Sequence, residues 1–121
     1  MNWEQFKNFS ENEFRCKCGC GKALMQQGFM EKLQELRTAY GKPMVISSGY
    51  RCPKHPVEAK KSAPGTHSEG LACDVAVLGA DAHQLLKLAM AMGFTGIGVN
   101  QKGAGRFLHL DTRQGAMVWS Y

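Results

Sequence analysis

Hydrophobic positions first repeat at helical spacing between Leu24 and Tyr40. The repeating apolar residues are Phe29, Met30, Leu33, Leu36 and Tyr40. They fall on one face of a helix, which Gly41 ends because glycine readily adopts the left-handed conformation at a helix C-terminus. A second helix is predicted from residue 80 or 81 to residue 92, where Gly93 ends it. The inner face of this second helix consists of Leu85, Leu86, Leu88 and Ala89.

Short apolar runs outside the helices predict strands. These runs cover residues 44–46, 71–77, 96–100 and 106–112, and the last two flank a glycine-rich turn, as in a hairpin. A long stretch with Gly, Pro and Ser, residues 47–70, separates the first strand from the second, and long loops in compact domains are often functional. The order of elements predicts one α+β domain over residues 1–121, with a mainly antiparallel sheet flanked by helices.

The composition restricts the class of protein. With 121 residues, 44% of them hydrophobic and 21% charged, the chain has the make-up of one ordinary globular domain. No apolar run approaches the ~18 residues of a membrane span. The N-terminal residues lack the basic and apolar regions of a signal peptide, so we expect synthesis in the cytoplasm. The net charge of +5 favours an anionic partner. Nucleic acid is not expected, because the basic residues are scattered.

Polar residues at three separate places have the composition of a catalytic metal site. His67 precedes the predicted strand 71–77, Asp74 lies in its middle, and His109 lies in the strand 106–112. A carboxylate inside an apolar strand is costly unless it is paired or bound to a cation. Two imidazoles and a carboxylate are the ligand set of a zinc site that keeps a fourth position for water. Each residue alone also fits an ordinary polar role, so the spacing leaves both interpretations open.

Alternation in the last of these strands places a second carboxylate near His109. Phe107, His109 and Asp111 share one face, whereas Leu108 and Leu110 face the other. A step of two residues in a strand is about 6.6 Å. Asp111 is therefore within reach either of a water at the metal, as a general base, or of a ligand histidine that it orients.

Three segments together resemble a known family. They are S-G-Y-R at 48–51, H-S-E-G-L-A-C-D at 67–74 and F-L-H-L-D at 107–111. In this order they resemble the zinc D-Ala-D-Ala peptidases, or peptidase M15-like proteins, over about residues 43–119. The chain is most similar to the compact subgroup found in phage and prophage genes, including endolysins, whose members often begin with a segment such as Glu13 to Cys18. The resemblance implies a fold like that of D,D-peptidase and hedgehog domains.

The resemblance implies roles for individual residues. His67, Asp74 and His109 would bind Zn²⁺, and Arg51 would hold the substrate carbonyl and its developing negative charge. Ser48 and Tyr50, in the same segment as Arg51, are predicted substrate contacts, although Tyr50 is expected to pack rather than react. The family usually has a Glu, Asp or His two or three residues before its last zinc ligand, where this chain has Phe107 and Arg106.

The general base is therefore a separate question. Asp111 is the predicted catalytic base, with the orienting role as its alternative. Glu69, in the loop before Asp74, is a weaker candidate that is expected to be solvated. Trp119 is predicted either to fill the core or to form a wall of the substrate cleft.

The five cysteines argue against a complete disulfide framework, because their number is odd. Three of them form the run C-K-C-G-C at 16–20. Two interpretations of this run stay open: idle or buried thiols, and a second metal site. The second interpretation requires Cys52 or Cys73 to lie close to the run. Cys73 is expected to point into the core, opposite Asp74.

The function that the resemblance implies is zinc-dependent hydrolysis of a peptide bond in the peptidoglycan stem, by an endolysin-like endopeptidase. A D,D-carboxypeptidase that releases terminal D-Ala is one alternative. A non-catalytic zinc-containing protein that binds the wall or belongs to a virion is the other. The expected partner is peptidoglycan and the expected state is a monomer. We expect the protein to reach the cell wall after phage-mediated release.

Overall fold

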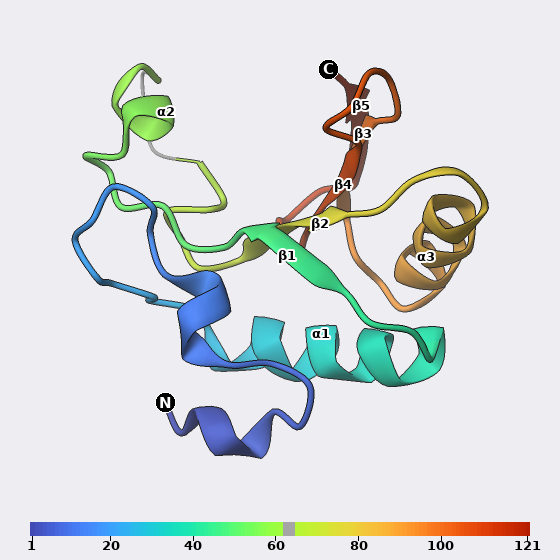
Figure 1. Ribbon diagram of the computed structural model, residues 1–121, viewed down its shortest axis with the longest axis horizontal. Coiled ribbons are helices and arrows are strands. Elements are labelled where there is room, and N and C mark those ends of the chain that lie inside the picture. Colours follow the sequence, from blue (N-terminus) through green and yellow to red (C-terminus); the bar gives the residue numbers. More distant parts are fainter. Residues whose placement is uncertain (62–64) are drawn as a thin grey trace.

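The computed structural model describes residues 1–61 and 65–121 of the chain. Its elements surround one five-stranded sheet (Figure 1). In chain order they are the 3-10 helices η1 (Trp3–Gln5) and η2 (Glu11–Phe14), then α1 (Gln27–Tyr40), β1 (Val45–Ser48), α2 (Pro56–Ala59), β2 (Ala72–Ala76), α3 (Gly79–Ala91), β3 (Gly96–Asn100), β4 (Phe107–Asp111) and β5 (Met117–Ser120).

The sheet has the strand order β1-β2-β4-β3-β5. All neighbouring strands are antiparallel except β3 and β5, which are parallel. The predicted α+β class with a mainly antiparallel sheet is confirmed, and so are both helices and four strands. The sequence analysis missed β5, an edge strand of four residues, because its mostly exposed side chains give no alternation of apolar and polar positions.

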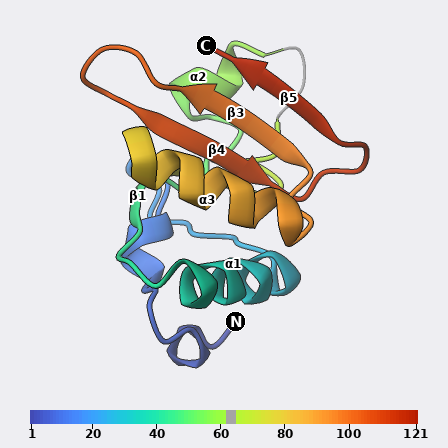
Figure 2. The same cartoon turned by 90° about the vertical axis from the view of Figure 1, so that its right-hand side faces the viewer.

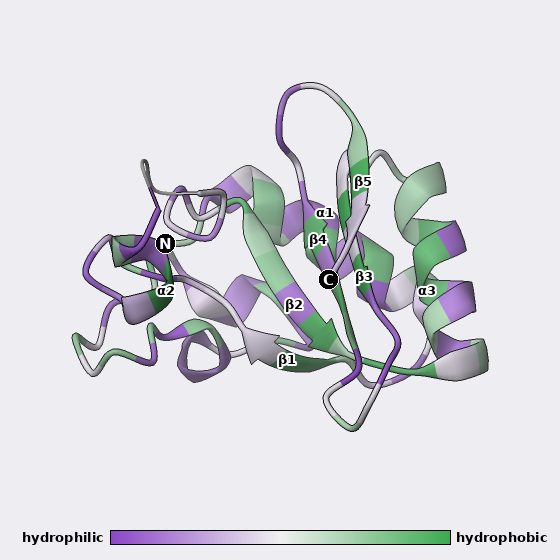
Figure 3. Cartoon of the chain, turned by 90° about the horizontal axis from the view of Figure 1, so that it is seen from above, coloured by the Kyte–Doolittle hydropathy of each residue, from purple (hydrophilic) through white to green (hydrophobic). Residues whose placement is uncertain are grey.

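The two long helices, α1 and α3, cover one face of the sheet, and the loop with α2 lies on the other side (Figures 1 and 2). Figure 3 shows the hydrophilic stretches of α3 on its outer side, away from the strands. Phe29 of α1 and Phe94, which follows α3, meet edge to face with their ring centroids 6.1 Å apart and join the two helices in the core. Gly41 ends α1 with φ 71°, as predicted. In the described ranges no helix has both the length and the apolar character needed to cross a membrane.

The N-terminal segment crosses closely over the loops that precede β2. A side chain at Gly70, where φ is +72°, would overlap the backbone carbonyl of Leu24, and Gln26 donates its backbone N–H to the Gly70 carbonyl at 3.0 Å. A Cβ at Gly49 would lie 2.6 Å from the Cα of Phe14. Both glycines belong to the segments that carry the family resemblance, and both allow one stretch of backbone to approach another.

Candidate metal centre

The sheet brings the three predicted ligands together. Asp74 on β2 and His109 on β4 are directly paired across neighbouring strands, and His67 arrives from the loop before β2. Their ligand atoms all lie within 4.8 Å of one another, and all three side chains are buried. His67 Nε2 lies 3.3 Å and His109 Nδ1 lies 3.1 Å from the same atom, Asp74 Oδ1. Two imidazole nitrogens and a carboxylate oxygen therefore converge on one point.

The outward nitrogen of each imidazole already has a partner. His67 Nδ1 lies 2.7 Å from the carbonyl oxygen of Gly49, and His109 Nε2 lies 2.7 Å from Asp111 Oδ2. Both partners only accept hydrogen bonds, so these nitrogens carry the protons, and a neutral ring turns its lone pair toward Asp74. A lone pair that faces a carboxylate is repelled by it, so the nitrogens toward Asp74 need either a proton or a metal ion, and the three residues fit a bound metal ion. A hydrogen bond at the ring nitrogen that faces away from the ion is typical of metal-binding histidines.

The pKa shifts at the cluster agree with this requirement for positive charge. Burial raises the pKa of Asp74, but the hydrogen bonds from His109 and His67 outweigh burial and lower the pKa well below its usual range. Burial lowers the pKa of His109, but its hydrogen bonds to Asp111 and Asp74 outweigh burial and raise it. The carboxylates thus stay ionised and attract either protons or a metal ion to the imidazoles.

Arg51 reaches the cluster from the loop after β1. Its Nη2 lies 3.4 Å from Asp74 Oδ2, and its Nε donates to the hydroxyl of Ser48 at 3.2 Å. The side chain is partly buried and forms part of the wall of a cavity beside the cluster. Ser48 holds the guanidinium in place. Among the described residues, neither Ser48 nor Tyr50 lines that cavity, and the buried ring of Tyr50 belongs to the core, which favours packing for Tyr50.

Glu58, on the short helix α2, was missed by the sequence analysis. The residue is only 2% exposed, and its carboxylate lies 3.4 Å from Arg51 Nη1. It also accepts the backbone N–H of Gly65 at 2.8 Å and the Nζ of Lys61 at 2.9 Å. Burial raises the pKa of Glu58, but these partners together lower it to about 2. Glu58 therefore holds Nη1 of Arg51, while Asp74 holds Nη2. The sequence carries no signal for this role, because E-A-K-K reads as a solvated surface.

Asp111 is buried behind His109, with its side chain 0% exposed. Besides His109, its carboxylate accepts Arg113 Nη2 at 2.6 Å and the hydroxyl of Thr66 at 3.3 Å. A Cβ at Gly96 would overlap this carboxylate, so glycine at that position leaves room for it. Asp111 is not one of the described residues that line the cavity. This placement favours the orienting role over the role of base, and the assignment itself stays a prediction.

A cavity of about 690 Å³ opens over the three ligands. Trp119 of β5 forms one wall, with its ring centroid 4.9 Å from that of His109, so this residue lies at the cavity wall and does not fill the core. The guanidinium of Arg113 stacks over the ring of Trp119, with Cζ 4.6 Å from the ring centroid. Glu69, the other wall carboxylate besides Asp74 among the described residues, is exposed. The wall thus combines an aromatic surface, cations and one solvated carboxylate next to the ligands.

Two comparisons with known proteins complete the description of the site. A family model described as Peptidase M15 matches residues 7–111. The match includes all three candidate ligands, Arg51 and Asp111. No curated protein matches the chain.

Proposed function

The chain belongs to the peptidase M15 family, and from this membership we propose that it is a zinc-dependent endopeptidase that cleaves the peptide stem of peptidoglycan. Membership of the family indicates a peptidase. The proposal adds zinc as the metal, peptidoglycan as the substrate and an endolysin-like role. The observation that carries it is the convergence of His67, Asp74 and His109 at the floor of an open cavity. Three nitrogen and oxygen ligands with free space beside them are the arrangement of a catalytic zinc site.

Zinc held by these three residues would act as a Lewis acid that polarises the scissile carbonyl and acidifies a water molecule. Arg51 supports the same step from the protein side. Its guanidinium is held by Asp74, Glu58 and Ser48 and lines the cavity. A cation fixed in this way stabilises negative charge on the carbonyl oxygen without having to reorganise during the reaction.

Proton transfer requires a group that reaches the cavity. We assign it to Glu69, whose carboxylate lies on the wall, where it accepts a proton from the attacking water and passes it to the leaving amine. Asp111 is assigned the positioning of His109, because both of its oxygens are occupied by hydrogen bonds behind that imidazole.

The proposal is tested by incubating the purified protein with peptidoglycan and analysing the released fragments by mass. We expect cleavage that stops when a chelator removes the metal and returns when zinc is added. The masses identify the bond. Fragments cut within the stem support the endopeptidase, whereas release of D-Ala alone from a soluble pentapeptide supports the D,D-carboxypeptidase instead. Intact peptidoglycan in the presence of zinc-loaded protein that binds the wall contradicts the enzymatic role.

The roles of Glu69 and Asp111 are separated by comparing Glu69→Gln with Asp111→Asn. We expect Glu69→Gln to retain zinc and lose about 10²- to 10⁴-fold in cleavage rate, as for a general base. We expect Asp111→Asn to weaken zinc affinity about 10- to 100-fold, with activity recovering in excess zinc. Zinc titration of both variants measures the difference. An Asp111→Asn variant that holds zinc normally but stays inactive at every zinc concentration would make Asp111 the base.

A further inference from the structure

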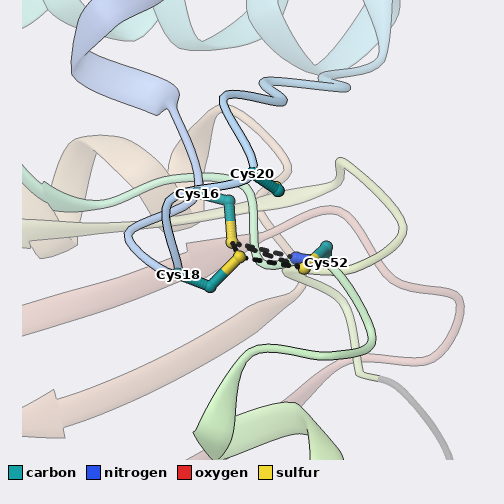
Figure 4. Close-up of side chains that lie close together, drawn as sticks. All are labelled: Cys16, Cys18, Cys20 and Cys52. Atoms are coloured by element: carbon teal, nitrogen blue, oxygen red, sulfur yellow. Dashed lines mark hydrogen bonds between the residues drawn. The ribbon is translucent and has the colours of Figure 1, made fainter.

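A second group of metal-ligand side chains lies outside the candidate metal centre. Cys16, Cys18 and Cys20 come from the C-K-C-G-C run, and Cys52 comes from the loop after β1 (Figure 4). Their four sulfur atoms all lie within 4.8 Å of one another. Cys16 and Cys52 are buried, whereas Cys18 and Cys20 are exposed. The fold thus supplies the fourth cysteine that the run by itself lacks. Cys73 is buried in the core, as predicted from its place opposite Asp74.

The distances between the sulfurs suit a shared metal ion better than disulfides. Cys16 Sγ lies 3.3 Å from Cys18 Sγ and 3.7 Å from Cys52 Sγ, and the Cys18 and Cys52 sulfurs are 3.3 Å apart. A disulfide would bring two sulfurs to about 2.05 Å. In a tetrahedral zinc site with Zn–S bonds of about 2.3 Å, the sulfurs are about 3.8 Å apart. The sulfurs therefore need only a small outward movement to surround one ion.

The loop that carries three of the cysteines is shaped to present them. Gly19 and Gly21 have φ of 94° and 76°, in the left-handed region, and a bond from the Cys16 N–H to the Lys22 carbonyl at 2.7 Å closes the loop. The backbone N–H of Cys52 donates to Cys16 Sγ at 3.3 Å. This bond holds the Cys16 sulfur beside the backbone of Cys52.

We propose that Cys16, Cys18, Cys20 and Cys52 bind a second zinc ion, which is structural. Thiolates select soft or borderline metals, and four protein ligands leave no position for water or substrate. Four thiolates with Zn²⁺ carry a net charge of −2, and the basic residues Arg15, Lys17 and Lys22 lie within or beside the run. This proposal concerns metal binding alone and stands independently of the proposed peptidase function.

The site would join the N-terminal segment to the loop that serves the candidate metal centre. Cys52 directly follows Arg51, and three residues before Cys52 the carbonyl of Gly49 holds His67. Tyr50, between them, donates its backbone N–H to the Phe14 carbonyl at 3.0 Å. Zinc bound by the four cysteines would therefore fix the Cys52 end of the Gly49–Cys52 segment, while the bond from Tyr50 to Phe14 holds its middle. Its contribution is to hold Arg51 and His67 in position without touching the substrate.

The first experiment alkylates the thiols of the full-length, zinc-loaded protein and identifies the modified cysteines by mass. Exposed thiols that bind no metal react at once. Because we propose that Cys18 and Cys20 bind zinc, we expect them to be protected in the zinc-loaded protein and to react after a strong chelator is added. Buried Cys73 is the internal control, protected in both conditions. Rapid alkylation of Cys18 and Cys20 in the zinc-loaded protein would overturn the proposal, and so would recovery of these cysteines as disulfides.

The second experiment counts metal ions in variants. We expect about two zinc ions per chain in the wild type and about one in a Cys18→Ser, Cys20→Ser double variant, because each cluster holds one ion. Asp74→Asn should also retain about one ion, and cobalt in that variant should show the thiolate-to-metal absorption that the cysteine variant lacks. Cys73→Ala serves as the matched cysteine control with both ions. Iron in place of zinc, or a double variant with unchanged zinc content, contradicts the assignment. Neither experiment measures wall cleavage, so both results can be interpreted even if the proposed peptidase function is wrong.

Discussion

Asp74→Asn should leave the fold intact and abolish both zinc binding at the His67–Asp74–His109 centre and peptidoglycan cleavage. The substitution preserves shape but removes the charge on which two imidazoles and Arg51 converge. A neutral amide is a poor zinc ligand. Because a Lewis acid supplies several kcal/mol of transition-state stabilisation, and about 4 kcal/mol corresponds to about a thousandfold in rate, we expect cleavage to fall at least about a thousandfold.

Metal analysis after dialysis and the rate at which peptidoglycan releases free amino groups measure the effect. The matched control is Asp81→Asn, which removes a carboxylate of the same type from an exposed ion pair with Lys42. An exposed pair contributes at most about 1 kcal/mol to stability, so this control should keep its zinc and its activity. Cleavage by Asp74→Asn at a rate close to the wild type would remove Asp74 from the ligand set.

Gly70→Ala should destabilise the domain by more than the positive φ of this residue alone would explain. At φ +72° an alanine costs about 1 to 2 kcal/mol. The added Cβ would also overlap the Leu24 carbonyl, a backbone atom that cannot rotate away. We expect a loss of roughly 3 kcal/mol or more in the free energy of unfolding, a large part of the roughly 5 to 15 kcal/mol of a typical domain. Denaturant unfolding of the metal-free protein measures it.

Gly103→Ala provides the control for conformation alone. Gly103 has φ +71°, almost the same as Gly70, but a Cβ there meets no atom within 4 Å. We expect a loss of only about 1 to 2 kcal/mol at this position. The difference between the two variants thus isolates the close approach of the N-terminal segment. Equal losses for both variants would mean that this segment yields to the new methyl group at little cost.

The parts of the fold and site predicted from sequence share one physical origin, the periodicity of regular structure. Alternation in 107–111 placed His109 on the face opposite Leu108, and this is the face that carries the ligands. Helical spacing located the buried face of 27–40. In both cases a local pattern fixes the direction of a side chain, and the resemblance to a family then indicated which of these faces meet.

The parts that were missed or left open depend on contacts between residues that are distant in the sequence or lie on different elements. Nothing in the order of residues places Cys52 beside Cys16, because a long stretch of helix, strand and loop lies between them. From the sequence, Glu58 is expected at the surface, but in the structure it is buried against Arg51 and Gly65. Whether Asp111 faces the cavity or lies behind His109 depends on Gly96 and Arg113, which belong to a different strand and to the turn after β4.

The three ligands of the candidate metal centre come from two regions that differ in local stability. Asp74 and His109 lie on β2 and β4, strands with a hydrogen-bonded neighbour on each side. His67 lies on a loop outside the sheet, joined to Arg51 by the bond from the Arg51 N–H to the His67 carbonyl at 3.3 Å and by the bond from the Ser68 hydroxyl to the Arg51 carbonyl at 2.6 Å. Amide hydrogens of paired inner strands exchange with solvent only on global unfolding, and those of loops exchange on small local openings. An ion bound by all three residues makes opening of the loop inseparable from release of the ion. We therefore expect the amide hydrogens of this loop to exchange more slowly in the metal-loaded protein than in the metal-free protein.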